Sequence, residues 1–167
     1  MRMLVSWMKE INFRIKRPNC MRFLFVLAGV FCLSLTFAEP GRLRATKGKL
    51  SAEVLVTKAA PNDNRLGWGF EIDPAKKRVA GVSIRNGNKK VYIAPSAWGD
   101  LADPNTVRFE TVKGATWLVI VGGDAAGSYR ARLKILGEYV TERVVESGEF
   151  PEAHFERTVY GWKEPKY

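Results

Sequence analysis

The sequence predicts an all-β fold: a single antiparallel β-sandwich or barrel of about eight mostly sequential strands with one short closing helix, preceded by a signal-peptide helix. Apolar and polar residues alternate in short runs, as they do on strands with one buried face. These runs recur about every ten residues, with turn-forming residues between them. Asn86-Gly87 adds a strong hairpin signal, because a type I′ turn needs two residues at positive φ.

Residues 21–38 have the pattern of a secretory signal: basic Arg22, an apolar run from 23 to 38, and a small residue, Ala38, at the cleavage position. A membrane-spanning helix needs about 20 apolar residues, so this run of 16 is short. We therefore expect cleavage and no permanent membrane span. We favour Met21 as the true start over a long basic n-region at residues 1–20. A third possibility is an uncleaved anchor with its basic end in the cytoplasm. All three place the remainder in the periplasm or outside the cell.

The chain then divides into an N-terminal extension with the signal at 1–38, a flexible basic lead at 39–47 and a single β domain at 48–167. The net charge of +10 overstates how basic that domain is, because residues 1–38 hold six basic groups and one acid. A strongly basic domain would indicate nucleic acid, and we expect no such partner here. Both cysteines, Cys20 and Cys32, precede the cleavage position, so the mature chain is free of cysteine.

Within the β domain, most elements follow from alternation. Leu66, Trp68, Phe70 and Ile72 alternate strictly with small or charged residues, which predicts one apolar and one polar strand face. Pro95, followed by Trp98 and Leu101 at helical spacing, predicts a short helix at about 96–102. The run 115–121 is apolar on both faces and should be a central strand. The predicted extended runs cover residues 50–57, 66–72, 78–85, 88–93, 107–112, 115–121, 128–136, 139–145 and 156–162.

The candidate binding residues form a basic stripe. Arg130, Arg132 and Lys134 alternate outward on one predicted strand, and Arg143 lies on the next, so a rigid face could hold an anionic glycan or an acidic envelope protein. The alternative is an ordinary solvated face balanced by acids such as Glu142. Asp124, at the tip of the loop 122–127, could also touch a ligand, although glycines there equally suit a plain hairpin connection.

Aromatic residues allow a second kind of site. Trp68, Trp98, Trp117 and Trp162 are numerous enough to line a cleft for a sugar or lipid, but filling the core is the default role of such side chains.

Chemistry-bearing motifs are scarce, and we expect a chain that is not an enzyme and holds no metal or cofactor. The mature part has no cysteine, one histidine and no zinc motif. The predicted function is therefore an exported, non-catalytic β module that binds an envelope-associated partner or glycan. One alternative is an assembly protein that pairs through an exposed edge strand such as 50–57. Another is a small hydrolase using carboxylates, with Asp100, Asp103 and Asp124 as candidates.

Overall fold

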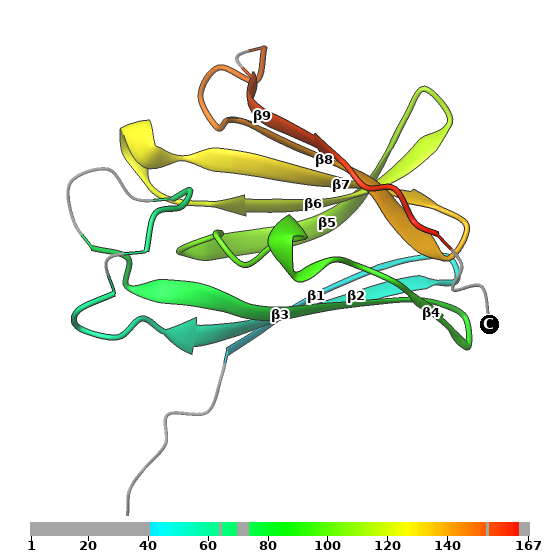
Figure 1. Ribbon diagram of the computed structural model, residues 1–167, viewed down its shortest axis with the longest axis horizontal. Helices are drawn as coiled ribbons and strands as arrows, with labels where there is room; N and C mark the ends of the chain where they lie inside the picture. Colours follow the sequence, from blue (N-terminus) through cyan, green and yellow to red (C-terminus); the bar gives the residue numbers. More distant parts are fainter. Residues whose placement is uncertain (1–40, 64, 70–73, 153, 164–167) are drawn as a thin grey trace, which may run out of the picture. The chain divides into compact units, whose positions relative to one another are not determined.

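The computed structural model describes residues 41–63, 65–69, 74–152 and 154–163. Within them the chain forms two antiparallel sheets, which Figure 1 shows as two facing layers. The four-stranded sheet runs β1 (Gly41–Lys47), β2 (Leu50–Lys58), β3 (Lys77–Asn86) and β4 (Lys89–Val91). The five-stranded sheet runs β5 (Pro104–Val112), β6 (Ala115–Gly122), β7 (Tyr129–Leu136), β8 (Tyr139–Ser147) and β9 (His154–Val159). The all-β, sequential antiparallel prediction is confirmed, and the two sheets make a sandwich.

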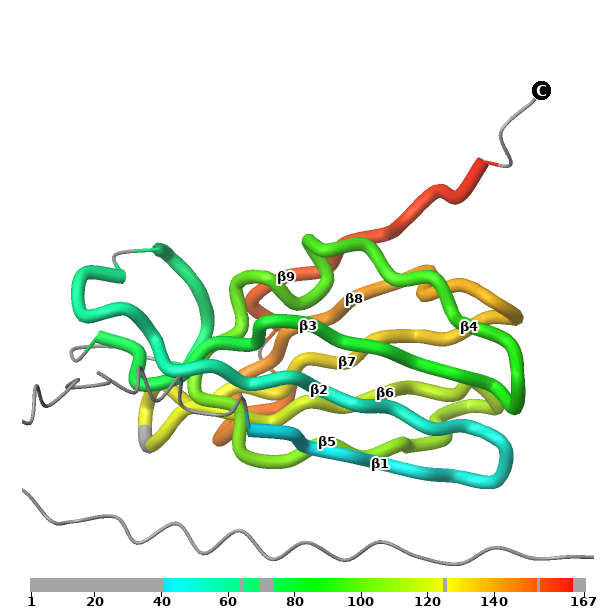
Figure 2. The backbone as a smooth tube through the Cα atoms, turned by 90° about the horizontal axis from the view of Figure 1, so that it is seen from below, coloured from blue at the N-terminus to red at the C-terminus, as the bar shows by residue number. Residues whose placement is uncertain are grey.

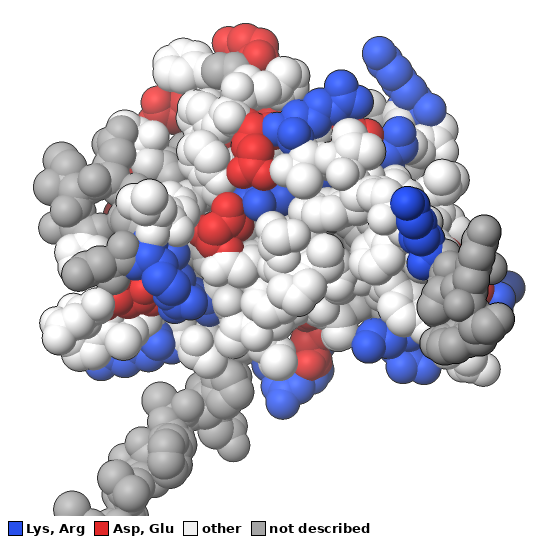
Figure 3. Space-filling view, viewed as in Figure 1, with Lys and Arg blue, Asp and Glu red and all other residues white. Residues whose placement is uncertain are grey.

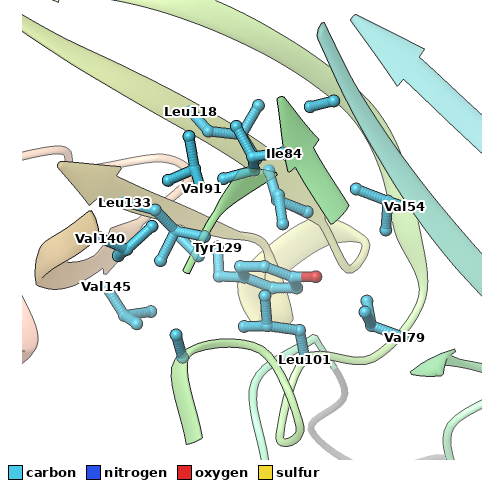
Figure 4. Close-up of a cluster of buried hydrophobic side chains, with 14 of the residues drawn as sticks. Val54, Val79, Ile84, Val91, Leu101, Leu118, Tyr129, Leu133, Val140 and Val145 are labelled. Atoms are coloured by element: carbon cyan, nitrogen blue, oxygen red, sulfur yellow. The ribbon is translucent and has the colours of Figure 1, made fainter. Parts of the chain in front are cut away.

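The core lies between the two sheets and contains the residues that alternation predicted to point inward. Val54 and Ile84 come from the four-stranded sheet, and Leu118 and Leu133 come from the five-stranded one; all four are fully buried (Figure 4). Burying each such aliphatic side chain contributes roughly 1.5–3 kcal/mol. Strand β6 lies between β5 and β7 and is buried on both faces, as its apolar sequence predicted.

The β3–β4 hairpin closes one residue later in the chain than the Asn86-Gly87 signal predicted. Asn86 pairs with Lys89, which leaves Gly87 and Asn88 as the two loop residues, and Gly87 has a φ of 58°. Beyond β4, the Tyr92 amide donates to the carbonyl of Glu138 and the Val140 amide donates to the carbonyl of Tyr92. These bonds join the end of β4 to β8, so the two sheets are connected along this border.

Residues 41–47, predicted to be a flexible lead, instead form strand β1, which lies at the border of the four-stranded sheet (Figure 2). Leu43 pairs with buried Val54 and packs against the core, while Arg42 and Arg44 both bind the carboxylate of Glu53 on β2. Because β1 covers it, the strand at residues 50–58 is not an edge strand. The edge-pairing alternative was therefore wrong about which strand is exposed.

The predicted strand at 66–72 is absent from the residues that the structure describes there, and residues 70–73 lie outside them. Leu66 is 91% exposed, and Trp68 forms only an isolated bridge with Leu101. Gly69 has a φ of 109°, and a Cβ there would collide with the carbonyl oxygen of Ala102. The alternation of small and apolar residues in this segment therefore does not mark a strand. The small residues permit close backbone packing, and Trp68 stacks on Phe155 with 5.0 Å between the ring centroids.

The predicted closing helix is shorter than expected. It is the 3₁₀ helix η1 (Pro95–Ala97), and a turn follows in which the Gly99 amide donates to the carbonyl of Pro95. Ala97 and Leu101 of this segment are fully buried in the core, so the segment does cover part of it. The remaining helix, η2 (Ala125–Gly127), belongs to the β6–β7 connection. Within the described ranges, no helix has the length and apolar character needed to span a membrane.

Asp63 should make stability depend on acid pH. Its carboxylate accepts hydrogen bonds from Arg65, at 2.6 and 2.8 Å, and from Arg78 at 3.2 Å, and these bonds hold the pKa of Asp63 well below its usual range. An unfolded Asp has a pKa of about 3.9. Because the folded pKa is the lower one, the stabilisation by this carboxylate is complete above about pH 4 and is lost as the pH falls towards the folded value.

We therefore expect the difference in melting temperature between the protein and Asp63→Asn to be constant from pH 7 to about pH 5 and to shrink below about pH 4. The matched control is Asp124→Asn, since Asp124 is exposed and has no ion pair within the described residues. The melting temperature of Asp124→Asn should equal that of the parent at every pH. A difference for Asp63→Asn that persists undiminished at pH 2 would contradict the proposed linkage.

Candidate functional site

The outer surface of the five-stranded sheet carries a small apolar cluster of its own. On β6, Leu118 and Ile120 point into the core, so Trp117 and Val119 point outward, where they pack with Val144 of β8. Trp117 is only 8% exposed, although neither of the two described sheets covers this face. Long charged side chains cover it instead.

Two cations from the neighbouring strand β7 lie over the Trp117 ring. The Arg132 guanidinium carbon is 5.1 Å from the ring centroid and the Lys134 ammonium is 5.7 Å from it, both within the range of cation–π attraction. Trp117 pairs with Lys134 in the ladder between β6 and β7. Arg132 lies two residues before Lys134, on the same face of β7. The strands thus fix both cations relative to one aromatic ring.

Two glutamates of β8, the buried Glu146 and the half-buried Glu142, complete this arrangement. Glu146 accepts a hydrogen bond from Arg132 at 2.5 Å and lies 3.4 Å from the Nδ1 atom of His154. Glu142 accepts from Arg157 at 2.7 Å and lies 3.5 Å from the Lys134 ammonium. Each carboxylate is shared between a residue of β7 and one of β9, so the pairs tie three strands together across the face.

These side chains surround an open hollow of about 390 Å³, a size at the small end of ligand pockets. We call this surface the Trp117 face. Lys113, in the β5–β6 turn, contributes a further cation to the rim and has no ion pair within the described residues. Four cations therefore face two carboxylates, which gives the hollow a positive balance. Its lining consists of Val112, Lys113, Ala115, Trp117, Arg132, Lys134, Glu142, Val144, His154 and Arg157.

The structure brings together only part of the predicted basic stripe. Arg132 and Lys134 line the hollow, and Arg130 continues the same face of β7 without reaching it. Asp124 is exposed in the β6–β7 connection and does not line the hollow either. Sequence reasoning missed the roles of His154 and Arg157, and it named Trp117 only as one of four tryptophans that could line a cleft.

Arg143 does not lie on the outer face, where the stripe had placed it. It pairs with the core residue Leu133, is 3% exposed, and donates to both carboxylate oxygens of Asp100, at 2.7 and 2.8 Å. It also donates to the carbonyl of Ser96 at 2.9 Å and lies 3.3 Å from the carboxylate of Glu156. Its evident role is to fasten the η1 segment to β8.

Two of the three acids considered for hydrolysis, Asp100 and Asp103, have structural partners, whereas Asp124 has no ion pair within the described residues. The carboxylate of Asp103 accepts the backbone amides of Lys76 and Lys77, at 3.1 and 2.7 Å, and Asp100 is held by Arg143. Tyr129 is fully buried nearby, and desolvation, with smaller contributions from Asp100 and Asp103, raises its pKa above the usual value. In the part of the chain that the structure describes, no three His, Cys, Asp or Glu side chains are grouped closely enough to hold a metal ion.

Comparison with known proteins adds no family to this description. No protein-family model matches the chain, and no curated protein or solved structure is significantly similar to it.

Proposed function

We propose that this chain is an exported, non-catalytic β module that binds an anionic glycan of the cell envelope through the Trp117 face. One observation carries the proposal: Arg132 and Lys134 are fixed over the Trp117 ring beside an open hollow with a positive balance. Arginine and lysine supply hydrogen-bond donors for carboxylate or sulfate groups. Their attachment to rigid strands limits the side-chain ordering that binding would otherwise require.

A sugar acid fits this face better than a neutral sugar. The Trp117 ring lies under the two cations and is 8% exposed, so it orients Arg132 and Lys134 more than it offers a stacking surface. The carboxylates of Glu142 and Glu146, on the neighbouring strand β8, bind the same cations and can share them with an incoming anion. The non-catalytic part of the proposal is supported by the structural engagement of Asp100 and Asp103.

Retention on an immobilised uronic-acid polysaccharide, polygalacturonate, tests the binding proposal. We expect the protein to be retained at low salt, to elute as salt screens the charges, and to pass through neutral dextran. Hydrogen bonds to charged groups contribute about 1.5–3 kcal/mol each. Arg132→Gln with Lys134→Gln should therefore lower the affinity at least about a hundredfold.

The matched control is Arg85→Gln with Lys90→Gln. These two exposed residues are paired neighbours on β3 and β4, so the control removes the same charge from the other sheet. It should leave retention unchanged. Equal losses in both double variants would mean that only net charge matters, and the Trp117 face would not be the site.

The proposal that the protein is exported is based on the sequence pattern at residues 21–38, and its test does not depend on glycan binding. Cell fractionation should recover the protein outside the cytoplasm, and N-terminal sequencing should find Glu39 first if the signal is cleaved. A cytoplasmic protein that begins before residue 38 would refute it.

Edge-strand assembly remains the rival function, now transferred to β9. Among the strands that the structure describes, this one pairs only with β8, and it exposes Phe155 at 47% and Val159 at 70%. If β9 pairs with a second copy, Val159→Lys should convert an oligomer to a monomer in analytical ultracentrifugation, because edge charges oppose pairing. The same change should leave polygalacturonate retention intact.

A further inference from the structure

A second hollow, of about 650 Å³, lies at one end of the four-stranded sheet. Strand β1 begins there, β2 ends there and β3 begins there, because the register pairs Gly41 with Val56 and Lys58 with Lys77. Four cationic side chains from these segments and the preceding turn line it: Arg42, Lys58, Lys76 and Lys77. We call this group the Lys77 corner. Basic side chains appear along the lower left margin in Figure 3, at this end of the sheet.

The corner is built by the fold rather than by one run of sequence. The Asp103 carboxylate binds the backbone amides of Lys76 and Lys77, and the Lys77 carbonyl accepts the Asp103 amide at 3.0 Å. These bonds fix the two backbones beside the end of β2. The floor of the hollow includes the apolar residues Leu43, Val56 and Pro104.

The charge at this corner is largely uncompensated within the described residues. Arg42 binds Glu53 at 2.6 Å, whereas Lys58, Lys76 and Lys77 are exposed and have no ion pair there. The far end of the same sheet is also basic: Lys89 binds Glu138 there, but Lys49 and Lys90 have no ion pair within the described residues. The corner differs from that end by its hollow with an apolar lining and by its closeness in the chain to the apolar run at 23–38. Three ammonium groups that have no ion pair in the described part of the chain, around an apolar floor, match a phosphate headgroup attached to a glycerol backbone.

Chain connectivity brings this corner to a membrane surface. Gly41 follows the apolar run at 23–38 by three residues, which span at most about 10 Å when extended. Whenever that run is inserted in a bilayer, as a signal before cleavage or as an uncleaved anchor, the corner starts within about one Debye length of the headgroups. Anionic lipids attract basic residues over this range.

We propose that the Lys77 corner binds the headgroups of anionic phospholipids and docks this end of the β domain on the membrane. The interaction is independent of glycan binding by the Trp117 face, which belongs to the other sheet. A basic residue near an anionic surface is worth about a fivefold change in the docking equilibrium. The three free lysines should therefore change it about a hundredfold.

A fluorescent reporter on the full chain tests this in either processing state. Cys20 and Cys32 are changed to Ser, and Thr57→Cys, an exposed position that lines the hollow, is labelled with bimane. The vesicles contain phosphatidylcholine with a spin label on its headgroup, which quenches bimane. They are prepared with or without about 30% of the anionic lipid phosphatidylglycerol. We expect quenching with phosphatidylglycerol, weak quenching without it, and loss of the difference in about 0.5 M salt.

The controls separate docking at this corner from general attraction. A reporter at Asn88→Cys, in the hairpin at the other end of the sheet, should stay unquenched in both membranes. Lys58→Gln, Lys76→Gln and Lys77→Gln together should abolish the quenching at position 57, while Lys49→Gln, Lys89→Gln and Lys90→Gln should preserve it. Equal quenching with and without phosphatidylglycerol, or equal losses in both triple variants, would overturn the proposal. Polygalacturonate retention should be unchanged in the first triple variant, so failure of one proposal leaves the other standing.

Discussion

Asp100→Ala should destabilise the protein by about 3 kcal/mol, because it leaves the Arg143 guanidinium buried without its main partner. Arg143 is 3% exposed, and Asp100 supplies two of its hydrogen bonds. The side chain of Glu156 lies 3.3 Å away and compensates only part of the charge. This places the expected cost at the lower end of the range for a broken buried ion pair.

Removing Arg143 instead of Asp100 should cost less stability. Arg143→Met deletes the charge and keeps much of the side-chain volume, and the Asp100 side chain, already 31% exposed, can then be solvated. We expect a loss of about 1 kcal/mol, chiefly from the unbonded Ser96 carbonyl. The double variant should be more stable than Asp100→Ala alone, because no buried charge remains.

Urea unfolding of the three variants measures these differences. A double variant at least as unstable as the sum of the single ones would show that Arg143 and Asp100 act independently, contrary to the geometry. Polygalacturonate retention should be the same in Arg143→Met as in the parent, since Arg143 does not reach the Trp117 face.

The position of Arg143 shows how one β-bulge makes the alternation pattern predict the wrong face of a strand. Counting by twos from the inward residue Val140 places Arg143 outward. The ladder with β7 has a bulge between Lys134 and Ile135, where Val140 pairs with Ile135 and Glu142 with Lys134. One extra residue in β8 reverses the faces from there onward. The sequence of β8 alone contains no mark of this bulge.

Other elements show what the sequence could and could not reveal. Arg132 and Lys134 were placed correctly because β7 alternates cleanly. The outward orientation of Trp117 was not predicted, because β6 is apolar on both faces and alternation alone does not show which residues face outward. Strand β1 was missed because its stabilising partner, Glu53, comes from the next strand and not from its own short basic run.

Gly122→Ala should destabilise the protein strongly, because the added methyl group would clash with a buried aromatic ring. Gly122 of β6 pairs with Tyr129 of β7, and a Cβ at position 122 would lie 2.5 Å from the tyrosine oxygen and 2.7 Å from two ring carbons. Tyr129 is fully buried, so its ring has no free space to move into. Overpacking of this kind costs roughly 1–3 kcal/mol, and we expect about 3 kcal/mol here because the obstacle is a rigid ring.

Gly81→Ala provides the matched control in strand β3. Its added methyl group would meet only the Cδ1 atom of Leu55, at an ordinary 3.6 Å. Alanine restricts the unfolded chain, so this variant should be neutral or stabilised by about 0.5–1 kcal/mol. Comparable unfolding midpoints in urea for the two alanine variants would contradict the proposed clash. Because Tyr129→Leu removes the ring, it should cost less in the Gly122→Ala background than in the parent. That coupling would assign the damage to the ring contact rather than to the backbone of β6.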